Sequence, residues 1–315
     1  MKIDISRHEW AVILNSQVLK FQRGKGWKRI ERLFRQNGIA HRLFVSQNQT
    51  DASDMIRQLI REGKRHFIVL GGDGTINHFV NHVMHEPIDH KEIFLVPFIL
   101  GTGNDWARTH FTKNSFMKQW EQFLVGNFAS HDVGKVTVLR DQQPQSDHYF
   151  VNIAGFGFDA EVIRNTLKRK FWIFPKLKYI HSLLVSLFRY QPTDVEIQFT
   201  DFQCKKKLFS LAVGIGSYNG NGIKQCPDAS PVDGEFDIIV IEKPPILKLI
   251  PNVPKIFRGT HVTSLKEITQ YKSDQLTIHA VPHIYGEVEG EMLPLGCYHI
   301  TSMPQAIQIL SEKWN

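Results

Sequence analysis

Cysteine is scarce in this sequence, and long apolar runs are missing from it. The 315 residues include three cysteines, Cys204, Cys226 and Cys297, and none of them forms a C-x-x-C pair. This usage is typical of a reducing compartment and indicates neither a disulfide framework nor a metal site. No stretch approaches the roughly 18–20 apolar residues of a membrane-spanning helix, and the opening "MKIDISRHEW" has no signal-peptide core. We therefore expect a cytoplasmic protein whose contact with membranes is peripheral.

The best-known phosphate loop is also missing, because nothing matches G-x-x-x-x-G-K-[ST]. The stretch "GIGSYNG" begins like a dinucleotide-binding fingerprint, but no helical pattern follows it, so we expect a loop there. Hydrophobic residues make up 42% and charged residues 22%, a balance that favours folded domains over extended disorder. The net charge of +7 indicates attraction to anions, which include nucleotide phosphates, anionic lipids and nucleic acid.

The first third of the chain alternates apolar runs with helical patterns. We expect four strands, at residues 10–14, 41–46, 67–70 and 93–100. Between them we expect three helices, at residues 27–36, at 53–61 with Thr50 or Asp51 as the cap, and after a glycine corner that follows residue 70. Strands that alternate with helices of this length predict a parallel sheet covered on both faces.

From about residue 131 the pattern changes to short β-rich runs separated by turns. Such runs predict an antiparallel sandwich or barrel, interrupted by one helical segment at about residues 176–190. The tail "AIQIL" predicts a last strand that returns to the first domain. We therefore place the domains at residues 1–130 with about 303–315, and at 131–302.

Two glycine corners follow neighbouring strands of the predicted parallel sheet. Phe67–Leu70 runs into "GGDGT", and "PFIL" runs into "GTGND". Ligands of parallel sheets bind beyond the carboxyl ends of the strands, where glycine lets backbone N–H groups face an anion. An aspartate at each corner makes sense if Mg²⁺ accompanies the phosphates. A tight turn with a capping aspartate would explain one corner alone, but two adjacent corners favour a phosphate site.

These motifs, "GGDGTINHFVN" and "PFILGTGND", resemble the diacylglycerol kinase catalytic domain of bacterial soluble lipid kinases, which are related to sphingosine kinases and NAD kinases. The likeness continues in "HDVGKV", "YFVNIAGFGFDAEV", "PDASPVDGEFDIIVIE" and "GTHV", and so covers most of the chain. The resemblance implies an N-terminal three-layer α/β/α domain, a C-terminal antiparallel β-sandwich and an active site in the cleft between them.

The resemblance also implies ATP and Mg²⁺ as cofactors and assigns residues to them. The nucleotide-binding residues would be Asn15, Gly71, Gly72, Asp73, Gly74, Thr75, Gly101, Thr102 and Asn104. The metal-site residues would be Asp73, Asp105 and Asp132, acting largely through metal-bound water, and Asp233 for a structural magnesium. A turn aspartate is the alternative for Asp132, and an Asp-Gly hairpin turn is the alternative for Asp233.

The family's catalytic base lies in a D-G-E motif, and here the matching residues are Glu289, Gly290 and Glu291. The resemblance makes Glu291 the general base and Asp73 the second catalytic residue. Were both glutamates on one strand, they would point the same way, and Glu289 would crowd the site. A polar hairpin with exposed glutamates is the alternative.

The opening motif departs from the family as well. The usual N-P-x-S-G stretch is missing, although Asn15 is kept and Gly24-Lys25-Gly26 comes later. These departures leave two other functions open, a soluble-substrate kinase of the NAD kinase type and a nucleotide- or lipid-binding protein with impaired catalysis.

Residues 162–193 contain no aspartate or glutamate but are rich in basic and aromatic side chains. The stretch "LKRKFWIFPKLK" favours contact with an anionic membrane surface, which a lipid substrate would require. The apolar stripe from Ile180 to Phe188 favours packing in the core. We expect no nucleic-acid partner, since no such motif accompanies the charge, and a homodimer stays open.

Overall fold

In the computed structural model, the described residues are 1–16, 25–99, 104–113, 115–168, 181–182, 185–220, 222–242 and 254–314. The chain forms two compact units. The N-terminal unit comprises Met1–Val133 with Pro304–Asn315, and the C-terminal unit comprises Gly134–Met303. No helix among the described residues is long and apolar enough to cross a membrane.

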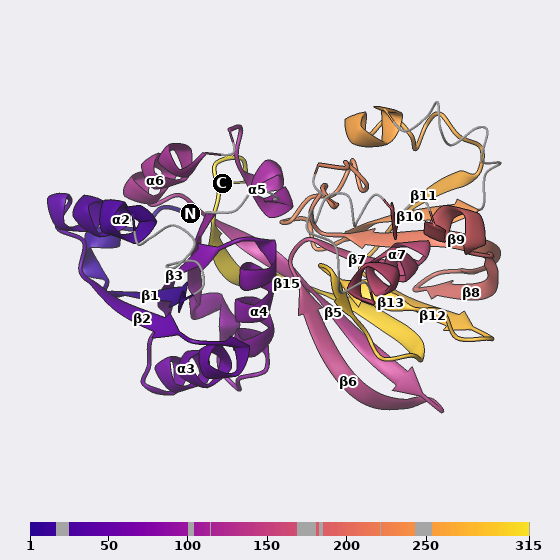
Figure 1. Ribbon diagram of the computed structural model, residues 1–315, viewed down its shortest axis with the longest axis horizontal. Helices are drawn as coiled ribbons and strands as arrows, with labels where there is room; N and C mark the ends of the chain where they lie inside the picture. Colours follow the sequence, from indigo (N-terminus) through magenta and orange to yellow (C-terminus); the bar gives the residue numbers. More distant parts are fainter. Residues whose placement is uncertain are drawn as a thin grey trace. The chain divides into compact units, whose positions relative to one another are not determined.

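The N-terminal unit alternates strands and helices along the chain (Figure 1). Its elements are η1 (Ile5–Arg7), β1 (Trp10–Asn15), α2 (Lys25–Gln36), β2 (His41–Ser46), α3 (Gln49–Arg61), β3 (His66–Gly71), α4 (Asp73–Met84), η2 (His90–Glu92), β4 (Phe94–Ile99), α5 (Asp105–His110) and α6 (Phe116–Val125). The strand β5 (Phe128–Arg140) and the last strand β15 (Cys297–Leu310) each run through both units.

The sheet of the N-terminal unit is parallel, with the order β2-β1-β3-β4-β15. The core strands are buried on both faces, as expected where helices cover the sheet on each side. Figure 1 shows α2 and α6 over one face and α3 and α4 over the other. Phe98 packs near Trp120 of α6 on the first face, and Phe67 packs against Phe79 of α4 on the second. The predicted three-layer α/β/α architecture is confirmed.

One predicted boundary in this unit is wrong. We expected a helix from Ser53 with Thr50 or Asp51 as its cap, whereas α3 starts at Gln49 and its cap is Asn48. The Asn48 Oδ1 atom accepts the N–H of Asp51 at 2.9 Å. Asparagine is a preferred N-cap because its short side chain reaches an orphan amide of the first turn.

The C-terminal unit is built mainly of antiparallel strands (Figure 1). Its elements are β6 (Gln143–Phe150), β7 (Ile153–Gly157), α7 (Phe158–Leu167), β8 (Thr193–Phe199), β9 (Gln203–Gly214), β10 (Phe236–Glu242), β11 (Ile268–Ser273), β12 (Gln275–Ala280), β13 (Gly286–Val288) and β14 (Glu291–Met292). The pairing runs β14-β13-β7-β9-β8-β12-β15, and β10 joins β9 to β11. The predicted antiparallel β-sandwich is confirmed.

The tail strand contributes to both units. The first part of β15 pairs antiparallel with β12, where Tyr298 lies opposite Ile278. The end of β15 pairs parallel with β4 of the N-terminal unit, where Gln308 lies opposite Phe94. The strand expected at "AIQIL" therefore exists and returns to the first sheet.

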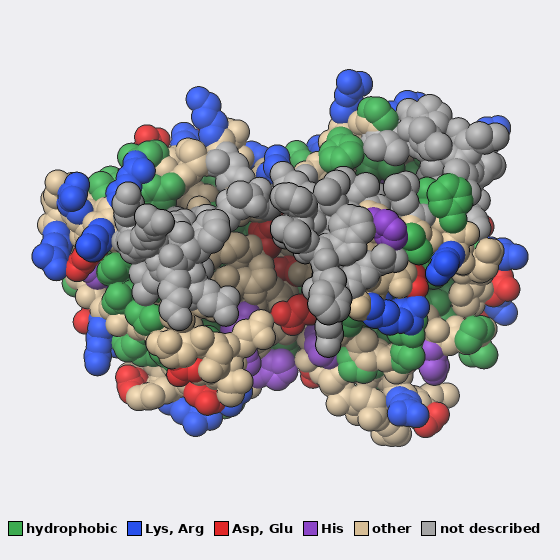
Figure 2. Space-filling model, in the orientation of Figure 1, with side chains coloured by type: hydrophobic (Ala, Val, Ile, Leu, Met, Phe, Trp, Pro, Cys, Tyr) green, Lys and Arg blue, Asp and Glu red, His purple; other side chains and the backbone are tan. Residues whose placement is uncertain are grey.

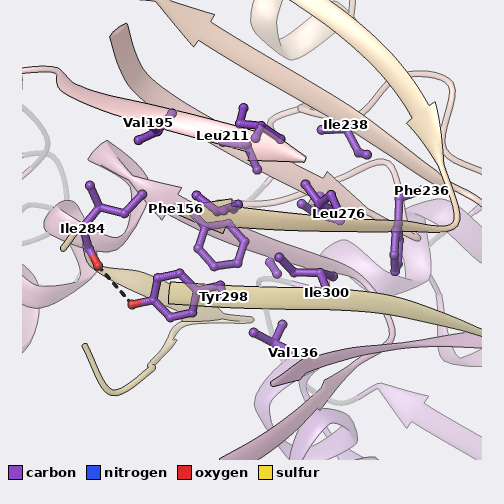
Figure 3. Close-up of a cluster of buried hydrophobic side chains, with 14 of the residues drawn as sticks. Val136, Phe156, Val195, Leu211, Phe236, Ile238, Leu276, Ile284, Tyr298 and Ile300 are labelled. Atoms are coloured by element: carbon purple, nitrogen blue, oxygen red, sulfur yellow. Dashed lines mark hydrogen bonds between the residues drawn. The ribbon is translucent and has the colours of Figure 1, made fainter. Parts of the chain in front are cut away.

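The inner faces of the antiparallel strands bury one large apolar cluster (Figure 3). Figure 3 shows side chains from β5, β7, β8, β9, β10, β12 and β15 converging on it. The Tyr298 ring lies 4.9 Å from that of Phe156, and its hydroxyl donates to the carbonyl of Ile284 at 3.0 Å. A buried tyrosine needs such a partner, because an unpaired hydroxyl would lose its hydrogen bonds with water.

Among the described residues, the elements that escaped the sequence prediction include the helices α6 and α7, the strand β11 and the short 3-10 helices η1 and η2. Much of the helix expected at residues 176–190 lies outside the described residues, although 181–182 and 185–189 are helical. Within this part, Leu187 packs on the cluster of Phe158, Val162 and Phe209, whereas Phe188 is 65% exposed. The predicted core stripe is therefore confirmed for Leu187 and wrong for Phe188.

Candidate active site

The carboxyl ends of the parallel strands place several predicted residues at one edge of the sheet. Asn15 ends β1, Gly71 ends β3, and Asn104 follows β4. In the order β2-β1-β3-β4, the chain leaves β1 toward one side and β3 toward the other. Ligands of open α/β sheets bind at such a switch point, because the diverging loops leave a crevice there.

Asp73 joins the two glycine corners. It is the first residue of α4, yet its carboxylate caps a different helix, α5. Oδ2 accepts the N–H of Asp105 at 2.9 Å, and Oδ1 accepts the N–H of Trp106 at 3.2 Å. Burial raises the pKa of Asp73, and these two N–H donors partly offset that effect. The corners are thus one constellation rather than two independent turns.

The glycines of the first corner serve different purposes. A Cβ on Gly71 would lie 2.3 Å from Thr75 Oγ1, so Gly71 is needed to let Thr75 fold back over the strand end. A Cβ on Gly72 or Gly74 would meet nothing within 4 Å, and Gly72 has a φ of −115°, which any residue adopts. Glycine in a helical turn costs roughly 1 kcal/mol relative to alanine. A ligand that approached the backbone closely would account for this cost.

The second corner is described from Asn104 onward, and Gly101 and Thr102 lie outside the described residues. Asn104 adopts a left-handed conformation, with φ 45° and ψ 49°, and is buried together with Asp105. Asp105 Oδ1 lies 3.4 Å from Arg108 Nε one turn along α5. The second corner therefore presents a buried carboxylate whose charge is balanced within its own helix.

Asp132 lies within β5 rather than in a turn, so the turn interpretation of this residue is wrong. The residue is 1% exposed, and its Oδ1 accepts the N–H of Gln305 in β15 at 2.7 Å. Gln305 has a φ of 51°, which allows its amide to point at this carboxylate. Asp132 thereby fixes β15 to β5, and its part in a magnesium network stays a prediction.

The donor set at this edge fits a nucleotide better than a directly bound metal. The open space beside Gly72 and Gly74 and the N-terminus of α4 suit a phosphate. Within the part of the chain that the structure describes, no three His, Cys, Asp or Glu side chains group closely enough to hold a metal ion. Both oxygens of Asp73 already accept backbone N–H groups. The arrangement therefore suits Mg²⁺ that is carried by phosphates and keeps several waters.

In the C-terminal unit, the predicted base motif forms a two-residue turn between β13 and β14. Val288 lies opposite Glu291, and the intervening Glu289 and Gly290 have φ values of 49° and 91°. Glu289 and Glu291 are thus not neighbours on one strand, and the expected crowding is wrong. Instead, Glu289 Oε1 accepts the N–H groups of Val151 and Asn152 at 2.7 and 2.8 Å. Glu291 is exposed, as a base must be to meet a substrate.

Two acids beside this turn, the buried Glu287 and the partly buried Asp159, escaped the sequence prediction. Glu287 on β13 and Asp159 on α7 both flank Gly155, where a Cβ would lie 2.5 Å from Glu287 Oε1 and 3.4 Å from Asp159 Oδ2. Burial, with Asp159 and Glu289 nearby, raises the pKa of Glu287 to about 8. Its Oε2 accepts the N–H of Gly290 at 2.6 Å and so holds the turn. The glycine in "NIAGFG" was the available signal, because a glycine inside a strand often marks a close approach.

Asp233 lies in an exposed turn before β10. Its Oδ1 accepts the N–H of Glu235 at 3.2 Å, and its Oδ2 lies 3.0 Å from Lys272 Nζ. These contacts satisfy the turn interpretation, and the structural-magnesium role stays a prediction.

Comparison with known families covers nearly all of the chain. Residues 9–136 match the diacylglycerol kinase catalytic domain. Residues 152–311 match the YegS C-terminal NAD kinase beta sandwich-like domain. The two matches meet near the boundary between the compact units.

Individual relatives are similar over most of their length. A diacylglycerol kinase of Staphylococcus carnosus is 26% identical over 280 residues, covering 88% of this chain and 86% of the relative. A diacylglycerol kinase of Bacillus subtilis is 27% identical over 232 residues and covers 72% of each chain. A crystal structure of a Bacillus anthracis diacylglycerol kinase superposes with a TM-score of 0.66 at 16% identity, over 97% of each chain, which shows a shared fold.

Proposed function

The chain belongs to the diacylglycerol kinase catalytic-domain family and is a lipid kinase, and from that premise we propose the reaction and the residues that perform it. The chain transfers the γ-phosphoryl group of ATP, with Mg²⁺, to the hydroxyl of a diacylglycerol-like lipid. The diacylglycerol kinases of Staphylococcus carnosus and Bacillus subtilis support this substrate class through their names and their coverage.

The observation that carries the proposal is the joined pair of corners in the N-terminal unit. The Asp73 carboxylate caps the start of α5, while Gly72 and Gly74 leave open space beside the chain at the β1–β3 switch point. Phosphoryl transfer depends mainly on positioning and on neutralising the triphosphate charge. Backbone N–H groups of this corner and the N-terminus of α4 would bind the phosphates.

Mg²⁺, when bound with ATP, neutralises charge that develops on the phosphates during transfer. Asp73, Asp105 and Asp132 would orient the waters around it, since their carboxylates are fixed by contacts within the N-terminal unit. Asn15 at the end of β1 and Thr75 at the start of α4 would lie on either side of the nucleotide. These contacts would hold the three carboxylates in place before the nucleotide arrives.

Glu291 is the proposed general base. Its exposed carboxylate would take the proton of the lipid hydroxyl as the new oxygen–phosphorus bond forms and the bond between the γ-phosphorus and the ADP oxygen breaks. The turn that carries it is fixed from two sides, by Glu289 on the backbone of Val151 and Asn152 and by Glu287 on Gly290. A fixed turn keeps the base within reach of one position of the acceptor.

Because the acceptor is a lipid, the proposal includes contact between the protein and a membrane surface. Leu167 and Phe188 are 60% and 65% exposed, and each lies beside a basic residue, Lys168 and Arg189 respectively. Exposed apolar side chains with basic neighbours favour the interface of an anionic bilayer.

The test is transfer of labelled γ-phosphate from ATP with Mg²⁺ to acceptors in mixed micelles: diacylglycerol, ceramide, sphingosine and phosphatidylglycerol, with NAD assayed separately in solution. We expect labelled lipid with diacylglycerol. Labelled NADP without labelled lipid would contradict the proposal and favour an NAD kinase-type activity. ATP binding without any transfer would favour a binding protein.

Variants in the same assay test the base. Glu291→Gln should lower turnover at least ~100-fold, the scale of a general base, while ATP binding stays unchanged. Glu235→Gln is the matched control, because Glu235 is an exposed glutamate on a turn of the same unit. Normal turnover in Glu291→Gln would remove Glu291 from the mechanism.

A further inference from the structure

Two imidazoles meet where α4 packs against α3. His78 and His82 are four residues apart on α4 and therefore lie on the same face of that helix. Their ring centroids are 4.4 Å apart. Both Nε2 atoms point at Ser53 of α3, whose Oγ lies 3.3 Å from His78 and 2.7 Å from His82. Figure 2 shows histidine side chains reaching the surface beside α4.

The backbone of α3 supplies a fourth atom to this cluster. The carbonyl oxygen of Gln49 lies 2.8 Å from Ser53 Oγ and 3.2 Å from His78 Nε2. Four separations among two nitrogens and two oxygens thus fall between 2.7 and 3.3 Å. Ligands that bind zinc tetrahedrally at about 2.0–2.1 Å are separated by roughly 3.3 Å. A small outward movement of the side chains would therefore admit an ion at the centre.

The chemistry of the four atoms selects the class of ion. Imidazole nitrogen suits zinc, copper and nickel, whereas Mg²⁺ prefers carboxylates, carbonyls and water. A neutral imidazole is the form that coordinates metals. Both histidines are partly exposed, so an ion can reach them from solvent.

We propose that His78, His82, Ser53 and the Gln49 carbonyl form a binding site for one late first-row divalent ion, of which Zn²⁺ is the test case. The described residues contain no group of three or more His, Cys, Asp or Glu at such a place, so this site relies on two imidazoles and two oxygens. The ion links α3 to α4, the helix whose first turn carries the phosphate corner. The site is separate from the nucleotide and is independent of the proposed kinase reaction.

The test is a Zn²⁺ titration of the full chain after chelator treatment, followed by calorimetry and by competition with a chromogenic chelator. We expect one tight equivalent in the wild type. His78→Ala and His82→Ala should each weaken it at least ~10-fold, the scale of losing a group that shapes a metal site. His85→Ala is the matched control, since His85 lies just beyond α4, is exposed, and directs Nδ1 at the carbonyl of Asn81. It should bind as the wild type does.

Co²⁺ provides a second readout that does not depend on affinity. A site with two imidazoles should give the visible absorption of four-coordinate Co²⁺, and His82→Gln, which keeps a polar side chain beside Ser53, should lose it. Wild-type affinity and stoichiometry in both the His78 and His82 variants would overturn the proposal. A loss in His85→Ala as large as in His82→Ala would also overturn it, because the ion would then use another set of histidines.

Discussion

Glu287 and Glu289 are separated by one residue, yet their carboxylates have opposite environments. Glu287 is 2% exposed and lies beside Asp159, so its charged form loses water without gaining a cation. Glu289, which is partly buried, accepts two backbone N–H groups through Oε1. The alternation of side chains along a strand predicts neither environment, because each depends on the backbone segment that folding places opposite the carboxylate.

Glu287 should make the stability of the fold depend on pH. Its pKa is about 8 in the folded chain against an ordinary value of 4.5, so the unfolded chain binds fewer protons between these values. The contribution of Glu287 to the free energy of unfolding should therefore be largest below pH 4.5. It should fall by on the order of 5 kcal/mol in total as the pH rises to about 8. Glu287→Gln should flatten this slope in denaturant titrations at several pH values. An unchanged slope would contradict a buried, protonated Glu287.

Glu289 should stabilise the C-terminal unit through its two hydrogen bonds. Glu289→Ala removes a partner of two backbone amides, and we expect the free energy of unfolding to fall by roughly 2–3 kcal/mol. Glu289→Gln keeps an oxygen that can accept both N–H groups and should lose much less. The measurement is chemical denaturation followed by circular dichroism. Equal losses in both variants would mean that the charge, rather than the hydrogen bonds, matters.

At the scale of elements, α5 depends on a residue outside itself. Its own N-cap residue, Asn104, is left-handed and makes no side-chain cap, and Asp73 from α4 accepts the first amides instead. A helix of six residues has little stability of its own. A cap supplied by a neighbouring helix therefore contributes more to the stability of α5 than it would to that of a long helix.

Asp73→Ala should therefore impair both folding and function. Loss of an N-cap costs about 0.5–2 kcal/mol, and we expect a loss of this size in denaturant titrations, together with loss of ATP-dependent transfer. Asp73→Asn separates the two effects, because its Oδ1 can still accept one amide while the charge is gone. We expect most of the stability to return in that variant without the activity. Full activity in Asp73→Asn would remove the charge of Asp73 from the mechanism.

The exposed side chains of Leu167 and Phe188 should take part in binding vesicles. Replacing both by serine removes apolar area that an interface would bury, and each fully buried side chain of this size is worth roughly 1.5–3 kcal/mol. We expect at least ~10-fold weaker binding to vesicles that contain an anionic lipid, measured by sedimentation. Phe202→Ser is the control, since Phe202 is also exposed, at 46%, but precedes β9. Equal losses in the control would contradict a specific surface.

At the scale of the whole molecule, the buried His131 and the partly buried His66 should limit stability in acid. Burial lowers the pKa of His66 and of His131 to about 4, against an ordinary value of 6.5. The unfolded chain then binds more protons between pH 4 and 6.5, so stability falls as the pH falls through this window. For His131 the loss is on the order of 3 kcal/mol.

His66→Phe tests this prediction without breaking a hydrogen bond that the structure assigns to His66. The ring of His66 stacks on His8 and Phe94 at centroid distances of 3.9 and 4.8 Å, and phenylalanine keeps the stacking. We expect a shallower fall of the denaturant midpoint between pH 6.5 and 4.5 than in the wild type. Identical acid profiles would mean that His66 is protonated as readily in the folded chain as in the unfolded one.

Local patterns determined much of this protein. Apolar runs and helical spacing predicted the parallel strands and both architectures, because burial imposes periods of 2 and 3.6 on any sequence that folds this way. The two glycine corners likewise predicted that their residues would meet at one edge of the sheet, since both corners follow strand ends that the sheet brings together. Helices α6 and α7 escaped prediction, as did the cap of α3.

Only the tertiary structure decided what each polar side chain touches. Asp73 caps α5 across 32 positions of the chain, Asp132 binds β15 across 173, and Glu289 binds the 151–152 backbone across 138 and 137. A side chain's partner and the pKa that results depend on the backbone brought opposite by folding, and no local spacing encodes that. The sequence by itself therefore determined the family, the layers and the strand ends at which the phosphate site is proposed, while the fold decided which carboxylates are fixed, buried or exposed.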